Sequence, residues 1–127
     1  MIPILLAAAL AGSPTIAQMT WQRRVLLIVA PRAGDPALAA QRRSLDGWDA
    51  GARERDLAIV QVIGDRVDGA GDSAAALRRR FRLPAERFVA ILIGKDGGEK
   101  MRSPRPIAPE ILSETIDAMP MRRAGRR

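Results

Sequence analysis

The chain has 127 residues, enough for one domain with a hydrophobic core, and 47% of them are hydrophobic. It contains no cysteine, histidine or tyrosine. This composition excludes disulfides and thiol redox chemistry, and it removes the commonest neutral-pH base and metal ligand. The net charge is +7, from 21 Lys and Arg against 14 Asp and Glu. Residues 122–127 form an arginine-rich tail, which is either a solvated, frayed end or a contact for anionic membrane or nucleic acid.

The first 17 residues carry no charged side chain. Their apolar run over residues 2–11 has the length of a signal-peptide core and is too short to span a bilayer. A Gly-Ser-Pro sequence then interrupts it, and small residues stand at Thr15 and Ala17. We expect a signal peptide over residues 1–17, cleaved after Ala17, and hence an exported protein of the periplasm or extracellular space. A retained membrane anchor and a buried core helix are the alternatives.

The first half of the expected domain, residues 18–121, begins with a lead-in that contains Trp21, expected to pack at the sheet edge or cap the core. Residues 24–30 are a buried strand stopped by a proline, which cannot donate to a sheet ladder. An Asp-Pro pair then predicts a helix over residues 36–46. After a mixed connector over residues 48–55, an apolar run predicts a strand over residues 56–63.

The second half begins with a predicted helix over residues 73–82, whose apolar residues fall on one stripe. Residues 88–93 are all apolar and predict a strand in the middle of the sheet. An Asp-Gly turn and a short charged strand ending at Ser103 complete a hairpin. Residues 109–119 predict a last helix, which Pro120 ends.

This order, β-α-β-α-β-β-α, predicts an α/β fold in which helices cover both faces of the sheet. Helical crossovers give parallel strands, and the final hairpin adds an antiparallel strand at one edge. We therefore predict a thioredoxin-like three-layer sandwich with a mixed four-stranded sheet.

Four sequence stretches carry a family resemblance: RVLLIVAP at 24–31, ERDL at 54–57, KDGG at 95–98 and IDAMPMR at 116–122. With them, residues 20–123 resemble the DUDES domain, a bacterial domain of unknown function that also occurs in vertebrate extracellular-matrix proteins such as equarin and the sushi-repeat proteins. The resemblance implies a thioredoxin-like fold, usually in exported proteins, without an established activity. It supplies no catalytic residues.

Arg32 and Asp35 follow the first strand, at the end of an α/β sheet where ligands favour binding. A thioredoxin or peroxiredoxin would place its reactive cysteine there. Arg32 and the free amides of the first helical turn could instead hold a carboxylate or phosphate, although Asp35 would compete for those amides. The alternative is a plain loop with a surface arginine.

The lysine-rich hairpin offers a second candidate contact. Lys95, Lys100 and Arg102 could form a basic rim for an acidic partner. The KDGG sequence lacks the spacing of a phosphate-binding loop and opens no helix, so it reads as a turn.

Two further groups of charged residues are interpreted as structural. Arg78, Arg79 and Arg80 point about 100° apart on a helix and form no single patch, and few aromatic residues are present for base stacking. Nucleic acid is therefore not an expected partner. Asp65, Asp68 and Asp72 lack the order of a calcium-binding loop and are interpreted as turn formers and a helix cap.

The leading hypothesis is an exported, non-catalytic binding module at the cell envelope, with a protein or an anionic surface as partner and no metal, cofactor or catalytic residue. The alternative is a cysteine-independent enzyme, or an anion-binding protein, derived from a peroxiredoxin-like fold. It would use Arg32, Asp35 and Lys95. A solvent-open pocket joining those three residues would favour the enzyme, and an exposed apolar patch would favour the binding module.

Overall fold

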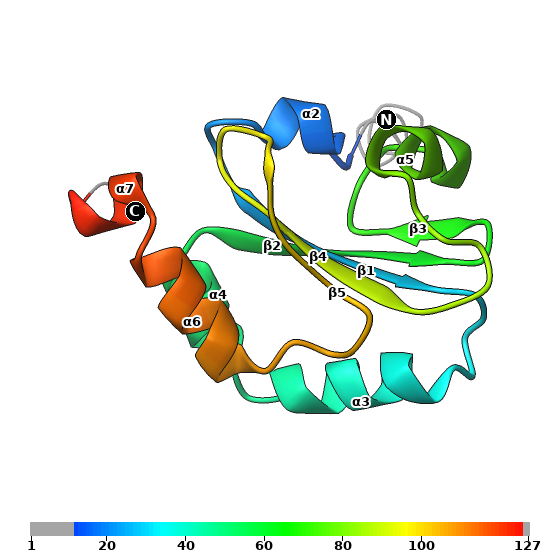
Figure 1. Ribbon diagram of the computed structural model, residues 1–127. Coiled ribbons are helices and arrows are strands. Elements are labelled where there is room, and N and C mark those ends of the chain that lie inside the picture. Colours follow the sequence, from blue (N-terminus) through cyan, green and yellow to red (C-terminus); the bar gives the residue numbers. More distant parts are fainter. Residues whose placement is uncertain (1–11, 126–127) are drawn as a thin grey trace, which may run out of the picture.

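A computed structural model describes residues 12–125, in which helices pack on both faces of one mixed sheet (Figure 1). The sheet has five strands in the order β3-β2-β1-β4-β5. They are β1 (Arg24–Ala30), β2 (Leu57–Ile63), β3 (Arg66–Asp68), β4 (Val89–Ile93) and β5 (Glu99–Ser103). The helices are α2 (Ile16–Met19), α3 (Pro36–Leu45), α4 (Asp49–Glu54), α5 (Ala74–Phe81), α6 (Pro109–Asp117) and α7 (Pro120–Arg123).

The predicted α/β sandwich is confirmed, with corrections to its strand count and to the direction of one strand. Strand β3, short and largely exposed, pairs antiparallel with β2 and makes a fifth strand beside the four predicted ones. It reverses the chain after β2, so that β4 runs antiparallel to β1 rather than parallel. Strands β1 and β2 are parallel, as the helical crossover between them requires.

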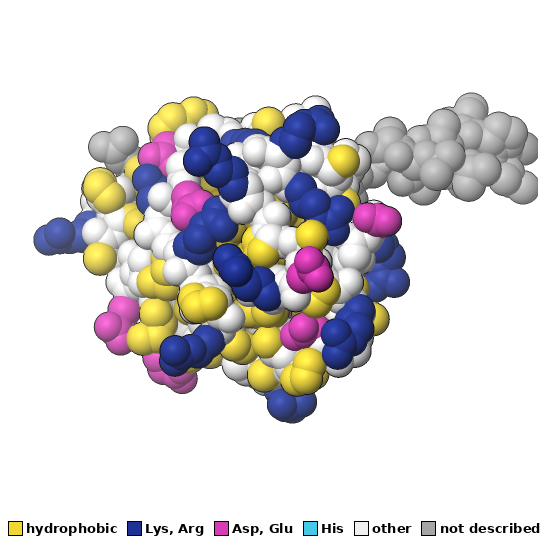
Figure 2. Space-filling view, turned by 45° about the vertical axis from the view of Figure 1, so that its right-hand side comes forward, with side chains coloured by type: hydrophobic (Ala, Val, Ile, Leu, Met, Phe, Trp, Pro, Cys, Tyr) yellow, Lys and Arg dark blue, Asp and Glu magenta, His cyan; other side chains and the backbone are white. Residues whose placement is uncertain are grey.

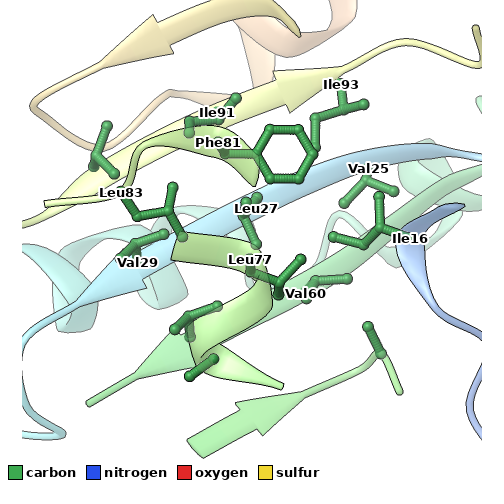
Figure 3. Close-up of a cluster of buried hydrophobic side chains, with 14 of the residues drawn as sticks. Ile16, Val25, Leu27, Val29, Val60, Leu77, Phe81, Leu83, Ile91 and Ile93 are labelled. Atoms are coloured by element: carbon green, nitrogen blue, oxygen red, sulfur yellow. The ribbon is translucent and has the colours of Figure 1, made fainter. Parts of the chain in front are cut away.

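The centre of the sheet is β1, with β4 beside it, and every residue of both strands is buried. Side chains alternate between the two faces of a strand. Val25, Leu27 and Val29 therefore join one core with α2 and α5 (Figure 3), while Leu26 and Ile28 join a second core with α3 and α6. Because helices cover both faces of the sheet, the central strands must be apolar on both faces.

Two segments are more ordered than expected. The connector over residues 48–55 contains α4, whose Gly51 lies against the Trp48 ring, where a β-carbon would meet ring atoms at 2.3 Å. Of the basic tail, Arg122 and Arg123 lie in α7, and residues 126–127 lie outside the described residues. Arg122 forms ion pairs with Glu54 and, at 3.0 Å, with Asp117.

Helix α2 packs its first residue into the core. Ile16 is 2% exposed, its amide donates to Asp72 Oδ1 at 2.8 Å, and Thr15 closes a capping box with Gln18. The folded part of the chain therefore includes residues upstream of the domain boundary expected at residue 18. The expected signal-peptide core over residues 2–11 lies outside the described residues. Within the part that is described, no helix has both the length and the apolar character needed to cross a bilayer.

Candidate functional site

Strained backbone marks two places on the surface. Among the described residues, Trp21, Asp56 and Arg82 are the non-glycine residues with positive φ, at 69°, 49° and 53°. The left-handed conformation costs a residue with a β-carbon about 1–2 kcal/mol. Such strain concentrates where a side chain is needed in a particular place. Trp21 lines one hollow in the surface and Arg82 lines another.

The first hollow, here the Trp21 pocket, has a volume of about 210 Å³. It lies where the turn before β1, the β4–β5 turn and the junction of α6 with α7 meet. Its walls are mostly apolar, although two lysines and an arginine reach it. The lining residues are Trp21, Arg24, Gly94, Lys95, Asp96, Lys100, Met119, Pro120 and Met121.

Lys95 contacts the two left-handed residues at the floor of the Trp21 pocket. Its side chain is 7% exposed, and Nζ forms an ion pair with Asp56 Oδ2 at 2.9 Å. Its carbonyl accepts the Trp21 amide at 2.6 Å, and the Asp56 carbonyl accepts the Arg24 amide at 2.9 Å. The two left-handed residues Trp21 and Asp56 are thus both bonded to Lys95.

Arg24 forms a buried part of the same floor. Its Nη1 donates to the carbonyl of Arg55 at 2.8 Å, and its Nε lies 3.3 Å from the Met119 sulfur. Burial, and then the charge of Arg122, lower the pKa of Arg24. A thioether is a weak hydrogen-bond acceptor, so Met119 gives this wall a soft apolar surface backed by a positive charge.

The β4–β5 turn forms the rim. Asp96 Oδ1 accepts the Gly98 amide at 2.9 Å, and Oδ2 pairs with Lys100 Nζ at 2.8 Å. The Lys100 hydrogen bond, followed by that from Gly98, lowers the pKa of the Asp96 carboxyl. Gly97 has a φ of 84°, so the predicted Asp-Gly turn is confirmed.

An ion network fixes the opposite wall. Asp117 accepts two hydrogen bonds from Arg55, at 3.2 and 3.0 Å, and one from Arg122 at 3.0 Å. The two Arg55 hydrogen bonds, ahead of the one from Arg122, lower the pKa of Asp117. Because Arg122 belongs to α7 and Asp117 to α6, this network holds the Met119–Met121 segment in place over the pocket.

The lysines of the Trp21 pocket each have a carboxylate partner, whereas its apolar surface is open. Trp21 is 63% exposed, the most exposed of the large hydrophobic residues that the structure describes. On the face that Figure 2 shows, small hydrophobic areas lie among Lys and Arg side chains, with fewer Asp and Glu side chains between them. The arrangement suits the binding of an apolar group by a surface with basic surroundings.

The second hollow, here the Arg82 hollow, has a volume of about 390 Å³. It lies beside the end of α5, the segment before β4 and the end of β5. Arginines and prolines surround an apolar floor. The lining residues are Arg82, Leu83, Pro84, Arg87, Phe88, Val89, Arg102 and Pro104.

The predicted site residues fall in three separate places. Lys95 and Lys100 line the Trp21 pocket, and Arg102 lines the Arg82 hollow. Arg32 and Asp35 lie beyond the other end of β1, and seven strand residues at about 3.3 Å each separate them from Lys95 by roughly 20 Å. The structure therefore does not bring Arg32, Asp35 and Lys95 together.

Asp35 acts as the predicted helix cap. Its Oδ1 accepts the amides of Ala37 and Leu38 at 2.9 and 3.3 Å, so it occupies the donors that an anion beside Arg32 would use. The other charged groups are also engaged locally. Arg78 and Asp65 pair at 3.2 Å, and the Arg80 guanidinium lies 4.7 Å from the Phe81 ring centre.

Sequence reasoning missed Trp21, Arg24, the Met119–Met121 segment and the two hollow arginines Arg82 and Arg87. Trp21 was expected to pack on the sheet or core, and it is exposed instead. A positive φ at tryptophan or arginine has no sequence signal, because glycine and asparagine are the residues that mark this conformation. The Met-Pro-Met sequence was a detectable signal, because two flexible apolar side chains flank a helix start there.

Comparisons with known proteins find a family model and a much longer protein that are similar to this chain. A family model described as "Domain of unknown function (DUF4174)" matches residues 15–125. The chain is similar to coiled-coil domain-containing protein 80 of Danio rerio, with 25% identity over 130 residues. That match covers 85% of this chain and 15% of the relative, so the chain corresponds to a small part of that protein.

Proposed function

The chain belongs to the DUF4174 family, a domain of unknown function, and on that premise we propose that it is a non-catalytic binding module. Its Trp21 pocket receives one apolar side chain of a partner protein. The partner segment carries carboxylates on either side of that anchor, because the pocket lies in a strongly basic chain. The observation that carries the proposal is an exposed tryptophan held in a strained conformation at the edge of an apolar hollow.

The strain argument supports a role for the Trp21 side chain. A fold that needed only a left-handed turn before β1 would use glycine there at no cost. At Trp21 the left-handed conformation instead costs about 1–2 kcal/mol of stability, and the side chain buries too little surface to offset that cost. Tryptophan is enriched among the residues that dominate binding energy in interfaces.

The size and surface of the pocket favour a side chain over a cofactor. At about 210 Å³ the pocket is smaller than the roughly 300–1,000 Å³ of typical small-molecule sites. Met119 and Met121 are flexible and polarisable, and methionine adapts to partners of different shape. The ion pairs of Lys95 and Lys100 hold the floor and the rim of the pocket in place, so little conformational freedom is lost on binding.

We also propose that the module is exported, from the uncharged apolar sequence over residues 2–11.

A displayed peptide library tests the binding proposal. Selection on the wild-type protein should enrich peptides with a large apolar or aromatic residue next to Asp or Glu. Trp21→Gly should abolish their binding and keep the fold, because glycine accepts the φ of 69°. Ile111→Ala is the matched control, since Ile111 is the other exposed large hydrophobic residue and lies outside the Trp21 pocket. Peptides that bind the Trp21→Gly protein as well as the wild type would refute the proposal.

A further inference from the structure

The Arg82 hollow lies away from the Trp21 pocket and shares none of its lining residues. Its most informative residue is Arg82, which ends α5 in the left-handed conformation at a φ of 53°. Glycine is the usual residue at this position, because it adopts the conformation without strain. An arginine here costs stability, so its side chain is expected to serve another purpose.

The three arginines of the Arg82 hollow are not equivalent. Arg102 is fixed, because it pairs with both oxygens of Glu99, at 2.8 and 3.0 Å, and donates to the carbonyls of Phe81 and Arg82. In the part of the chain that the structure describes, the side chains of Arg82 and Arg87 have no hydrogen bond or ion pair. The hollow therefore carries two uncompensated guanidinium groups beside a third that is held in place.

The end of α5 would ordinarily disfavour an anion, because helix carboxyl ends carry partial negative charge. Here Arg102 donates to the carbonyls of Phe81 and Arg82, and the Arg78 carbonyl accepts the Leu83 amide at 3.1 Å. These three carbonyls at the end of α5 therefore already accept hydrogen bonds, which reduces their repulsion of an anion.

Between the arginines the floor is apolar. Leu83, Phe88 and Val89 line it, with Pro84 and Pro104 at the sides. A volume of about 390 Å³ falls within the range of small-molecule sites, roughly 300–1,000 Å³. Guanidinium groups match phosphate oxygens in pairs, and a phosphate monoester carries close to two negative charges at neutral pH.

We propose that the Arg82 hollow binds a phosphate monoester whose organic part is apolar or aromatic, with Arg82 and Arg87 on the phosphate and the organic part on the Leu83–Phe88–Val89 floor. Arg102, whose charge is balanced by Glu99, holds the carbonyls of Phe81 and Arg82 away from the phosphate. This site is independent of the Trp21 pocket and of the function proposed for it.

Phenyl phosphate is the probe, followed by isothermal titration calorimetry or amide chemical shifts. Its affinity should exceed that of inorganic phosphate, which lacks the aromatic ring, and that of phenol, which lacks the phosphate. Arg82→Gly should weaken it at least about tenfold, as the loss of one charge-assisted contact predicts. The same variant should melt at an equal or higher temperature, because glycine suits the backbone there. Arg87→Ala should weaken binding similarly, whereas Arg43→Ala, at an exposed arginine of α3, should not.

Two further readouts complete the test. Affinity should fall between pH 7.5 and 5.5, because the phosphate loses charge near pH 6 while arginine does not titrate. Vesicles containing phosphatidic acid, compared with phosphatidylcholine alone, distinguish a lipid headgroup from a soluble ester as the source. Binding to either source that is lost in Arg82→Gly supports the site. No binding to either source, or equal binding by wild type and Arg82→Gly, would overturn it.

Discussion

Removing Ile16 should destabilise the domain severely, although it lies in a sequence that predicts a cleaved leader. Ile16 is 2% exposed and packs with α5 and both central strands in one core. Truncating a buried isoleucine to alanine costs about 2–5 kcal/mol. Its amide also bonds Asp72 at 2.8 Å, and the Pro14 carbonyl accepts the Gly71 amide at 2.9 Å. Each such hydrogen bond adds about 0.5–1.5 kcal/mol to the free energy of unfolding.

A chain that begins at Gln18 loses all of these contacts, together with the Thr15 cap, worth about 1 kcal/mol. The sum is about 4 kcal/mol or more, a large share of the roughly 5–15 kcal/mol that holds a domain of this size together. Urea unfolding followed by circular dichroism should show the loss for a chain that begins at Gln18 compared with one that begins at Gly12.

Ile16→Ala isolates the packing contribution in the longer chain, and Ile111→Ala at an exposed position of α6 is its control. If the chain from Gln18 unfolds within 1 kcal/mol of the longer one, the packing of α2 does not stabilise the fold. If the protein is exported, we expect its mature form to retain Thr15, which mass spectrometry of the secreted chain would establish.

Three further predictions concern buried polar groups and pH. Gln41→Leu should cost about 2–4 kcal/mol in urea unfolding, because Gln41 satisfies both the amide and the carbonyl of buried Ile107, at 2.7 and 2.9 Å; an unchanged midpoint would contradict this. Asp56→Asn should cost about 2–3 kcal/mol by leaving the Lys95 charge unpaired, and Lys95→Met in the same chain should recover part of it; additive losses would argue against the pairing. Stability should stay level from pH 6 to 8, because the chain has no histidine. It should fall as the pH drops below the ordinary carboxyl value of 3.8, because the pKa of Asp117 is lowered in the folded state, chiefly by Arg55. Asp117→Asn should flatten that acid limb, and an equally steep fall in the variant would exclude Asp117 as the cause.

The sheet was predictable from sequence where one physical signal dominated. Strands β1 and β4 are apolar on both faces, and continuous burial of this kind has few other solutions. Asp35 before Pro36 predicts a helix start, because an aspartate can accept the free amides and a proline fits the first helical position. The structure has Asp35 as the N-cap of α3 and Pro36 as its first residue.

The elements that were missed have weak local signals. Strand β3 consists of Arg66, Val67 and Asp68. It is a strand because it pairs with β2, and three mostly polar residues are too few to show a strand pattern in the sequence. Helix α4 contains Gly51, a poor helix former, and packing against Trp48 explains why glycine stands there.

The candidate site was predictable only in part. The hairpin turn itself was predictable, and it carries Lys95 and Lys100 to the Trp21 pocket. Lys100 pairs with nearby Asp96, whereas Arg102 lines the Arg82 hollow and buried Lys95 pairs with a partner that is distant in sequence. Asp56 lies 39 residues from Lys95, and the Met119–Met121 segment reaches the Trp21 pocket from the other end of the chain. Contacts of this range depend on the folded backbone, and no local pattern reports them.

The binding proposal is tested most directly by the indole resonances of the chain's two tryptophans during titration with a selected peptide. Trp21 lines the Trp21 pocket, whereas Trp48 packs against the second core, on the other face of the sheet from α5. We expect the Trp21 indole signal to shift in proportion to occupancy while the Trp48 signal stays in place. A bound peptide that leaves the Trp21 signal unmoved would contradict the account.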